Sequence, residues 1–492
     1  MSRARASDLL DRLDRDAAAF SGELSREHYL NGAGLKDDLQ TGPIFERYGW
    51  MFEREVVDKL QKTRPRDERY HALREFVVEA FIEDGARALT ERIAERETAD
   101  TIEWDGKSVP QRSIAPLIAN ESNPERRRAL DSARMDLVRA QNPLREERWE
   151  ILHARARDIG YPTYFDLWDD VSRLRLHELK ATAERFLWDT EESYRERLEA
   201  YLRGSGIPPA RAERCDLSFL FRAPQYDSLF PAAKLQSTLV ETLTGLGIDI
   251  ESQENVHLDT EARPRKSPRA FCSAIDVPGE VMLVINPQGG QDDFRALLHE
   301  AGHTEHFAHV PDDLPYAFRG LGDNSVTEGF AFLIEHTMKN PRWLESVMGL
   351  PDADEFLRFT NFNQLYLVRR YCAKLLYEAQ LHCGDNPRAS SKLYADLLTT
   401  HVGVRYTPVD YLSDLDDGFY AARYLRAWIF EAQVRRTLED RHGIEWFRSA
   451  EAGADIKSWW SFGQRYTAEG LLQRVGHAEL DVESLRRSLV PS

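Results

Sequence analysis

The chain of 492 residues is 42% hydrophobic and 30% charged, and it carries a formal charge of −18 with a pI near 5.4. This length allows one large core or two to four domains of roughly 100 to 200 residues each. The negative charge argues against nucleic acid as the main partner, because phosphates would be repelled.

The sequence predicts neither export nor a membrane partner. The start of the chain lacks the apolar core of a signal peptide, and no stretch approaches the roughly 20 apolar residues of a membrane span. The cysteines are scattered without paired spacing, so neither a disulfide framework nor a cysteine-based zinc module is expected. A reducing cytoplasm fits best. The cysteines are Cys215, Cys272, Cys372 and Cys383.

Residues 1–255 show a helical pattern, in which charged residues alternate with apolar ones at spacings of three and four. Short breaks rich in glycine and proline separate the segments, and no repeat or low-complexity linker marks a domain boundary. The clearest helices are predicted over residues 44–62, 69–97, 124–141, 145–159 and 176–202.

Residues 255–290 have a different pattern, which predicts a small sheet. The apolar runs at residues 270–275 and 281–285 are bounded by Pro-Gly and Asn-Pro turns, as short strands often are. One strand could offer its edge to an extended peptide through backbone hydrogen bonds. A buried hairpin that contacts no substrate is an equally good interpretation.

The segment His299-Glu300-Ala301-Gly302-His303 has the pattern of a zinc site. On an α-helix, His299 and His303 project from one face one turn apart, so both imidazoles can reach the same ion. Glu300 stands beside them, where it can act on a metal-held water. Gly302 costs roughly 1 kcal/mol relative to alanine inside a helix, which suggests that another element approaches closely there.

The same helix is expected to pack into the core through a separate apolar stripe. Asp292 and Asp293, which follow the turn at residues 287–290, offer an N-cap. The stripe consists of Phe294, Leu297, Leu298 and Ala301.

A zinc ion bound by two histidines needs a third protein ligand and an open position for water. Glu328, on a second helix predicted over residues 325–338, is the best candidate. Ser325 and Glu328 also match a capping box, in which the glutamate would only satisfy a backbone amide. Glu335, two turns further along the same face, would either orient a ligand histidine or lie on the surface as an ordinary acid.

Two further histidines are weaker candidates for the third ligand. His309 follows His303 by the spacing of the extended motif His-Glu-x-x-His-x-x-Gly-x-x-His. That motif leaves the helix at its glycine, and the corresponding position here is His306, which continues the helix. We therefore expect His309 to be carried away from the ion and His306 not to bind it directly.

The end of the chain is predicted to be helical again, over residues 354–382, 391–401 and 416–441. The last of these helices carries Tyr420, Arg423, Tyr424 and Arg426. By default such residues belong to the core. Tyrosine hydroxyls beside a zinc site could nevertheless donate to a developing oxyanion, and an arginine could hold a substrate carboxylate.

Taken in chain order, these features resemble the thimet oligopeptidase and oligoendopeptidase F family of zinc peptidases over roughly residues 255–440. Residues 270–272 resemble the family's Gly-Ala-Phe-Cys segment, and residues 299–306 fit its His-Glu-x-Gly-His-x-x-His motif. Glu328 lies where the family has its third ligand, and Glu335 matches a second acidic position.

The aromatic helix from Phe419 is similar to the family's C-terminal signature, whose tyrosines line the active site, but this sequence is divergent. Gly-Phe-Ala-Phe follows Glu328 where the family has Pro-Ser-Gln. Arg423 and Arg426 take places where tyrosines are common, which leaves Tyr420 and Tyr424 as the hydroxyl donors.

The resemblance implies a mainly α fold: a large helical metallopeptidase with a small β-sheet next to the His-Glu-x-x-His helix and a deep active-site channel. We expect an N-terminal helical half over residues 1–255 and a metal-bearing catalytic half over residues 256–492, joined in one continuous structural unit.

The implied activity is hydrolysis of short peptides with one Zn²⁺ ion. The resemblance assigns His299, His303 and Glu328 as metal ligands, Glu300 as the general base and Tyr420 or Tyr424 as the oxyanion donor. Two alternatives remain open. In a dipeptidyl carboxypeptidase, Arg423 or Arg426 would bind the C-terminal carboxylate of the substrate. A non-peptidase protein would retain the zinc site for structure.

Overall fold

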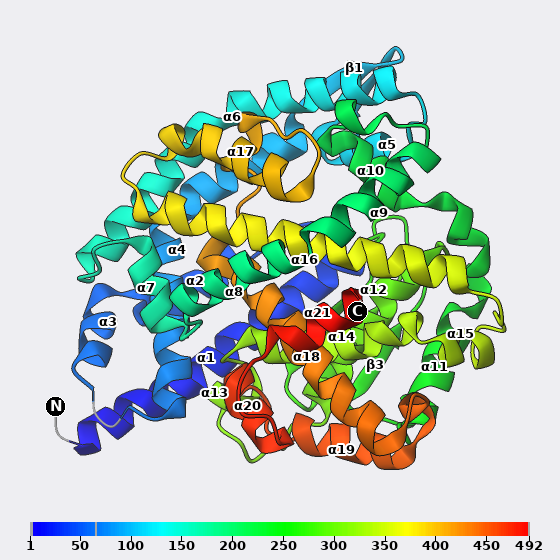
Figure 1. Ribbon diagram of the computed structural model, residues 1–492. Coiled ribbons are helices and arrows are strands. Elements are labelled where there is room, and N and C mark those ends of the chain that lie inside the picture. Colours follow the sequence, from blue (N-terminus) through cyan, green and yellow to red (C-terminus); the bar gives the residue numbers. More distant parts are fainter. Residues whose placement is uncertain (1–2, 64–65, 491–492) are drawn as a thin grey trace. The chain divides into compact units, whose positions relative to one another are not determined.

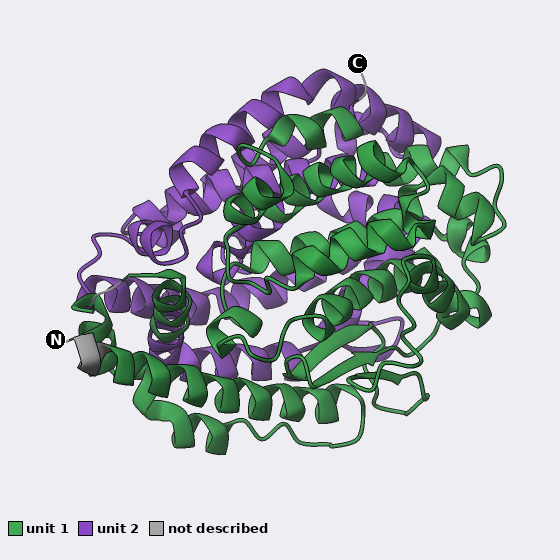
Figure 2. Cartoon of the chain, turned by 90° about the horizontal axis from the view of Figure 1, so that it is seen from below, with its two compact units in different colours: residues 1–78, 224–361, 426–488 green, residues 79–223, 362–425, 489–492 purple. Residues whose placement is uncertain are grey.

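The computed structural model describes residues 3–63 and 66–490, and it is mainly helical with a small sheet, as predicted (Figure 1). The chain falls into two compact units (Figure 2). Unit 1 comprises residues 1–78, 224–361 and 426–488, and unit 2 comprises residues 79–223, 362–425 and 489–492. Each unit contains segments from before and after residue 255. The division into an N-terminal half and a catalytic half at this residue stays a prediction.

The bounds of the elements follow the chain. The helices up to residue 245 are α1 (Arg3–Gly32), α2 (Gly42–Tyr48), α3 (Arg54–Gln61), α4 (Glu68–Ala99), α5 (Ile114–Asn120), α6 (Pro124–Asp158), α7 (Tyr164–Val171), α8 (Leu176–Asp189), α9 (Glu191–Gly204), α10 (Arg214–Arg222) and α11 (Leu235–Gly245). The later helices are α12 (Gln291–Ala308), α13 (Tyr316–Arg319), α14 (Asn324–Glu335), α15 (Pro341–Ser346), α16 (Asp354–Cys383), α17 (Ser391–Val402), α18 (Tyr420–His442), α19 (Ala450–Trp460), α20 (Ala468–Val475) and α21 (Val482–Leu489). The strands are β1 (Thr101–Trp104), β2 (Lys107–Pro110), β3 (Val256–Asp259), β4 (Phe271–Asp276) and β5 (Glu280–Val284).

Unit 1 contains a three-stranded sheet in the order β3-β5-β4. β5 pairs in parallel with β3 and antiparallel with β4, with Cys272 opposite Leu283. β4 and β5 confirm the two predicted strands, and their apolar side chains pack with the end of α1 around Ala33 and Ile275. β4 is thus an edge strand of this sheet.

Several predicted helices differ in the structure. In unit 1, the segment predicted as one helix over residues 44–62 is divided into α2 and α3 by a short 3-10 helix at Gly49–Phe52. Two further differences lie in unit 2. α6 is one continuous helix through Pro143, where the sequence predicts two. Proline removes one intrahelical hydrogen bond, but Asn142 Nδ2 donates to the Val409 carbonyl at 2.9 Å and helps hold the helix at this point. The segment predicted as one helix over residues 176–202 is broken at Thr190, whose hydroxyl donates to the Phe186 carbonyl at 2.7 Å.

The sequence analysis also missed a hairpin in unit 2. β1 and β2 pair antiparallel around Asp105 and Gly106, which have φ values of 49° and 72°. An Asp-Gly pair with positive φ at both positions is the signature of a type I′ turn. The local signal was therefore present inside a segment that otherwise reads as helical.

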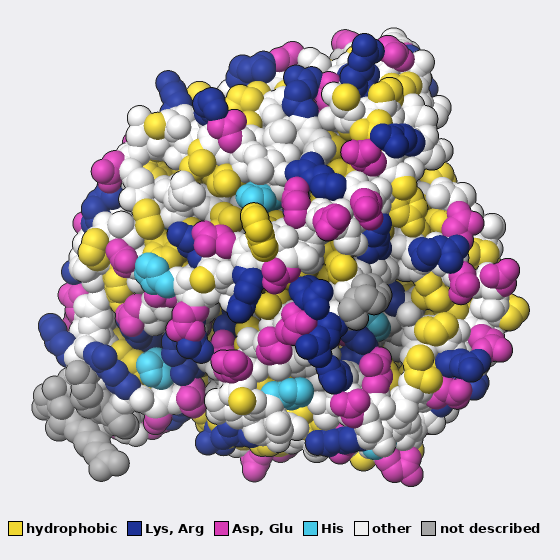
Figure 3. Space-filling view, in the orientation of Figure 1, with side chains coloured by type: hydrophobic (Ala, Val, Ile, Leu, Met, Phe, Trp, Pro, Cys, Tyr) yellow, Lys and Arg dark blue, Asp and Glu magenta, His cyan; other side chains and the backbone are white. Residues whose placement is uncertain are grey.

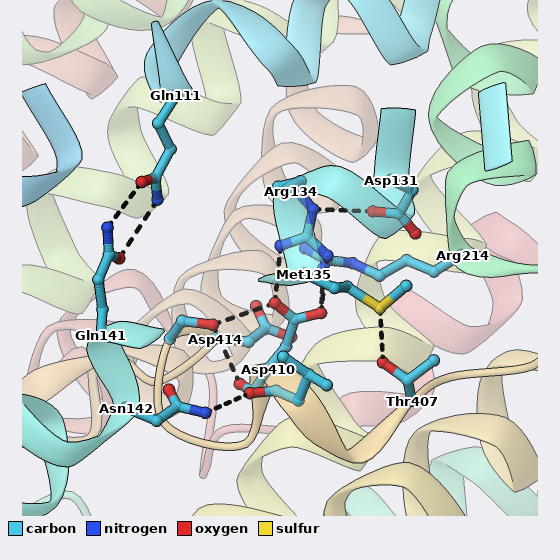
Figure 4. Close-up of polar contacts among 12 residues, drawn as sticks. Gln111, Asp131, Arg134, Met135, Gln141, Asn142, Arg214, Thr407, Asp410 and Asp414 are labelled. Atoms are coloured by element: carbon cyan, nitrogen blue, oxygen red, sulfur yellow. Dashed lines mark hydrogen bonds and ion pairs between the residues drawn. The ribbon is translucent and has the colours of Figure 1, made fainter. Parts of the chain in front are cut away.

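Ion pairs with the buried Asp410 tie distant segments of unit 2 together (Figure 4). Arg134 donates to both carboxylate oxygens of Asp410 at 2.8 and 2.9 Å, and Arg214 donates at 2.7 Å. Burial alone would raise the pKa of Asp410, but the two guanidinium groups outweigh burial and lower it. The carboxylate thus joins α6, α10 and the segment before α18.

On the face drawn in Figure 3, acidic and basic side chains are interspersed. Several helices carry exposed pairs of opposite charge one turn apart, such as Arg54 with Asp58 at 2.7 Å. Pairs of this kind contribute little stability, about 0.3–0.5 kcal/mol each. Within residues 3–63 and 66–490, no helix combines the length and the apolar character needed to cross a membrane.

Helices α12 and α14 of unit 1 pack in close backbone contact at Gly302. A Cβ atom on Gly302 would lie 2.6 Å from the Cα atom of Ala331 and 2.9 Å from the carbonyl oxygen of Phe330. Because Gly302 has no side chain, the backbones of α12 and α14 can approach more closely than any other residue at this position would permit.

Replacing Gly302 with alanine is expected to lower the free energy of unfolding by about 1–3 kcal/mol, because the added methyl group would push α14 away. Urea denaturation measures this change. Gly204 is the control, since it also belongs to a helix, as the last residue of α9, but a Cβ atom there would meet nothing within 4 Å. Gly204→Ala should be neutral or stabilise by less than about 1 kcal/mol. Equal losses for the two variants would contradict the role assigned to Gly302.

Candidate metal centre

α12 presents His299, Glu300 and His303 on its partly exposed face, while the stripe of Phe294, Leu297, Leu298 and Ala301 is buried. The predicted N-cap is wrong. The helix begins at Gln291 with Gly290 as N-cap, so Asp292 and Asp293 lie in its first turn. Asp293 Oδ2 instead accepts hydrogen bonds from the amides of Gln288 and Gly289 at 2.5 and 2.7 Å, which fixes the turn before the helix.

α14 brings Glu328 to the two histidines. The helix is capped by Asp323, which accepts a hydrogen bond from the Ser325 amide at 3.0 Å, so the helix start does not depend on the possible Ser325–Glu328 capping box. Glu328 Oε2 lies 3.3 Å from His299 Nε2 and 3.6 Å from His303 Nε2. Its carboxylate is thus directed at both imidazoles.

His299, His303 and Glu328 form a group that could hold a metal ion. One potential ligand atom from each residue lies within 4.8 Å of the other two. Two imidazole nitrogens and one carboxylate oxygen are a donor set that zinc accepts in catalytic sites with an open fourth position. Among residues 3–63 and 66–490, a search for three or more His, Cys, Asp or Glu side chains close enough to share an ion gives this group.

Hydrogen bonds at the Nδ1 atoms orient the rings of both histidines. His299 Nδ1 lies 3.0 Å from Glu335 Oε2, and His303 Nδ1 lies 2.9 Å from Thr327 Oγ1. With each Nδ1 engaged, each Nε2 is directed toward Glu328. Contacts of this type fix the tautomer and the ring orientation of metal-binding histidines.

The electrostatics of the group favour a cation. Burial works against a protonated His299, but its hydrogen bonds with Glu328 and Glu335 outweigh burial and raise its pKa to about 10. The same contacts outweigh the burial of Glu328 and Glu335 and lower the pKa of each carboxylate. A cation bound between the two imidazoles and Glu328 would be favoured by these carboxylates.

Glu300 is held by the edge strand of the sheet. The backbone amide of Cys272, on β4, donates to Glu300 Oε2 at 2.8 Å. This bond uses one oxygen of the carboxylate. Glu300 directly follows His299 and is partly exposed, as the two histidines are, so it lies beside the candidate metal ligands on α12.

Neither His306 nor His309 belongs to the group of potential ligands. His306 continues α12 but is fully buried, with its ring centroid 5.0 Å from that of Phe330, and burial lowers its pKa to about 3. His309 follows the helix as its C-cap, and its Nδ1 lies 2.9 Å from the carbonyl oxygen of Glu305.

Arg426 belongs to unit 1 and is only 1% exposed. Its guanidinium donates to Asp323 Oδ2 and to Glu469 Oε2, each at 2.8 Å, and to Ser325 Oγ at 3.3 Å. Because Asp323 caps α14, Arg426 anchors the start of the helix that carries Glu328. The role predicted for Arg426 in binding a substrate carboxylate stays a prediction. In the structure, its N–H groups donate to Asp323, Glu469 and Ser325.

Tyr420, Arg423 and Tyr424 lie in unit 2, whereas the candidate metal ligands lie in unit 1. The rings of Tyr420 and Tyr424 meet edge to face with centroids 5.0 Å apart, and Tyr371 lies 5.5 Å from Tyr424. Arg423 is buried, and its charge partly offsets the burial that raises the pKa of Glu79. The roles predicted for these residues in catalysis and substrate binding stay predictions.

Sequence reasoning missed three parts of this centre: Thr327, the amide of Cys272 and the cap at Asp323. Asp323 had a readable signal, since an aspartate just before a helix is a common N-cap. Thr327 precedes Glu328 directly, but nothing local shows that its hydroxyl meets a histidine 24 residues earlier.

Comparison with known proteins found no family model that matches the chain and no curated protein similar to it.

Removing Arg426 is expected to destabilise the protein strongly, because the carboxylates of Asp323 and Glu469 would remain buried without their cation. Loss of one partner of such a group costs about 3–5 kcal/mol. We expect a loss of this size for Arg426→Met in urea denaturation. Arg436 is the control on the same helix, since it is 52% exposed and pairs loosely with Asp440. A loss for Arg426→Met no larger than that for Arg436→Met would contradict the anchoring role.

Glu335→Ala is expected to weaken zinc binding by about 10- to 100-fold, because His299 would lose the partner that orients it. Thr327→Val, which removes only the hydroxyl, should act in the same direction on His303. Competition against a chelating dye measures both affinities. Glu345, a 49% exposed glutamate on α15, provides the control. Unchanged affinity in Glu335→Ala would show that the contact with His299 does not support metal binding.

Proposed function

We propose that the protein is a zinc-dependent oligopeptidase, which hydrolyses peptide bonds in short peptides. The observation that carries this proposal is the convergence of His299 Nε2, His303 Nε2 and Glu328 Oε2 on one position, with Glu300 beside them. Three protein ligands and an adjacent carboxylate are the parts that a hydrolytic zinc site requires.

His299, His303 and Glu328 would hold the ion. Glu335 and Thr327 would fix the orientation of the two imidazole rings. When bound, zinc supplies a Lewis acid that polarises a carbonyl and lowers the pKa of a water molecule to about 7. The carboxylates of the centre would favour a bound cation of this charge.

Glu300 would act as the general base and then as the general acid. Its carboxylate takes a proton from the attacking water and later passes this proton to the nitrogen of the leaving amine. The Cys272 amide fixes Oε2, so the group is already oriented before substrate arrives. Orientation of this kind reduces the entropy that must be lost in the transition state.

The substrate class rests on the sequence resemblance. Residues 270–272, the His299–His303 motif, Glu328 and Glu335 occur in the order seen in the thimet oligopeptidase and oligoendopeptidase F family. We propose that this chain is a divergent member of that family. A peptide substrate follows from that assignment.

Glu300→Gln tests the proposed function. The variant keeps the size of the side chain but cannot accept the proton, so we expect full zinc content and a loss of peptide cleavage of about 10²- to 10⁴-fold. Digestion of a peptide mixture, followed by mass spectrometry with and without a chelator, measures the loss.

Asp292→Asn is the matched control, because Asp292 is an exposed acid on the same helix that pairs with Arg295. It should cleave like the wild type. A zinc-loaded Glu300→Gln protein that cleaves at the wild-type rate would exclude Glu300 as the base, and a wild-type protein that cleaves no peptide would exclude the proposed activity.

A further inference from the structure

Unit 2 contains a cavity of about 180 Å³ that shares no residue with the candidate metal centre. Its walls come from α4, α6, α16 and the segment before α18, and all of its lining residues belong to unit 2. An engineered apolar cavity of about 150 Å³ binds benzene. The cavity in unit 2 is therefore large enough for one small molecule with a single ring or a short branched chain.

Most of the wall of this cavity is apolar. A ligand would gain free energy by placing a compact apolar body against these side chains, because both surfaces would be removed from water. The apolar lining residues are Ile93, Trp149, Leu152, Leu412 and Leu415.

Two hydrogen-bond donors of the wall have no partner among residues 3–63 and 66–490: Nη1 of Arg145 and Nε1 of Trp149. The two residues are only 8% and 5% exposed. They lie four positions apart on α6, so they project from the same face of the helix. A buried donor without a partner is costly, and a ligand with acceptor oxygens at this place would remove the cost.

The guanidinium of Arg145 is only partly used by the protein. Its Nη2 donates to Glu97 Oε1 at 2.6 Å and to Gln141 Oε1 at 3.0 Å. Glu97 is 48% exposed, so solvent screens its charge. Arginine presents its donors as a planar fork that suits a carboxylate, and one branch of this fork remains for a ligand.

The other ionisable groups of the wall have partners or are neutral. Arg148 donates to the two carboxylate oxygens of Asp417 at 2.8 and 2.9 Å and to Glu83 at 2.7 Å. His382 Nδ1 lies 3.0 Å from His153 Nε2, and burial lowers the pKa of His382 to about 3, so this ring carries no charge at neutral pH. The hydrogen-bonding capacity that remains in the wall is thus that of donors.

We propose that this cavity binds a small carboxylate with a compact apolar body. The carboxylate would accept hydrogen bonds from Arg145 Nη1 and Trp149 Nε1, and the apolar body would lie against the aliphatic side chains. Inorganic phosphate or sulfate fits less well, because its remaining oxygens would face apolar groups. This inference does not rest on the proposed function, since neither the metal ligands nor Glu300 take part in it.

The test is calorimetric titration of the full-length protein with benzoate, which has one ring and one carboxylate. We expect one site per chain with a Kd below about 1 mM and a rise of Tm in the presence of benzoate. Benzamide has the same shape without the charge, and acetate has the charge without the ring. Both compounds, and inorganic phosphate, should bind at least about tenfold more weakly.

Three variants locate the site. Arg145→Gln removes the charged fork, and Trp149→Phe removes the indole N–H but keeps an aromatic ring. Each should weaken benzoate binding by about tenfold or more. Ile93→Trp, which fills the cavity from a partly exposed position, should abolish binding. Circular dichroism and Tm show whether each variant is folded.

The matched controls are Arg139→Gln and Trp188→Phe. Arg139 lies on the same helix as Arg145 but is 60% exposed, and Trp188 is 84% exposed. Both variants should bind benzoate like the wild type, because neither residue lines the cavity.

Three results would overturn the inference. These are no binding of benzoate by the wild type at about 10 mM, equal affinity for benzamide and benzoate, and undiminished binding in the folded variants Arg145→Gln and Trp149→Phe. None of these results bears on the metal centre, whose zinc content is measured separately.

Discussion

The candidate centre depends on the backbone contact between α12 and α14 at Gly302. The histidines come from one helix and Glu328 from the other, so the distance between the helices decides whether their ligand atoms can share an ion. With a Cβ position only 2.6 Å from the Cα atom of Ala331, the two helices have no room for a larger side chain between them. A displacement of about 1 Å would be enough to disturb such a site, because metal coordination tolerates only a few tenths of an ångström.

Ion pairs at the N-terminus of α14 help to hold this helix in place beside α12. The buried Asp323 and Arg426, together with the partly buried Glu469, fix the N-terminus of α14, three to five residues before Glu328. Glu335 then engages His299 at the other end of the same helix. Buried ionic groups are costly to desolvate, and here they define the position of a helix that must bring its carboxylate to two histidines. The surplus of carboxylates at the centre is the property that favours a bound cation.

The parts of the structure that could be predicted from the sequence are those fixed by local periodicity. Four-residue spacing places His299 and His303 on one helical face, seven-residue spacing places Glu328 and Glu335 on another, and Gly302 signals a close approach. β4 and β5 follow from apolar runs between turns. Tertiary contacts could not be predicted from local patterns. The hydroxyl of Thr327, the amide of Cys272 and the carboxylates around Arg426 are each far in sequence from the side chain that they contact. Asp292 and Asp293 were misread as caps because Gly290, with a φ of 93°, ends the preceding turn and lets α12 begin two or three residues earlier than predicted.

Zinc binding by the purified, metal-stripped protein is the most direct test of this account. Titration with Zn²⁺, followed by X-ray absorption at the zinc edge, reports both the stoichiometry and the ligand atoms. The account predicts one tightly bound ion, with two imidazole nitrogens and carboxylate and water oxygens at about 2.0–2.2 Å. This shell should lose one imidazole in His303→Ala. A protein that binds no zinc, or a shell that contains sulfur or is unchanged in His303→Ala, would contradict the assignment of His299, His303 and Glu328 as a metal centre.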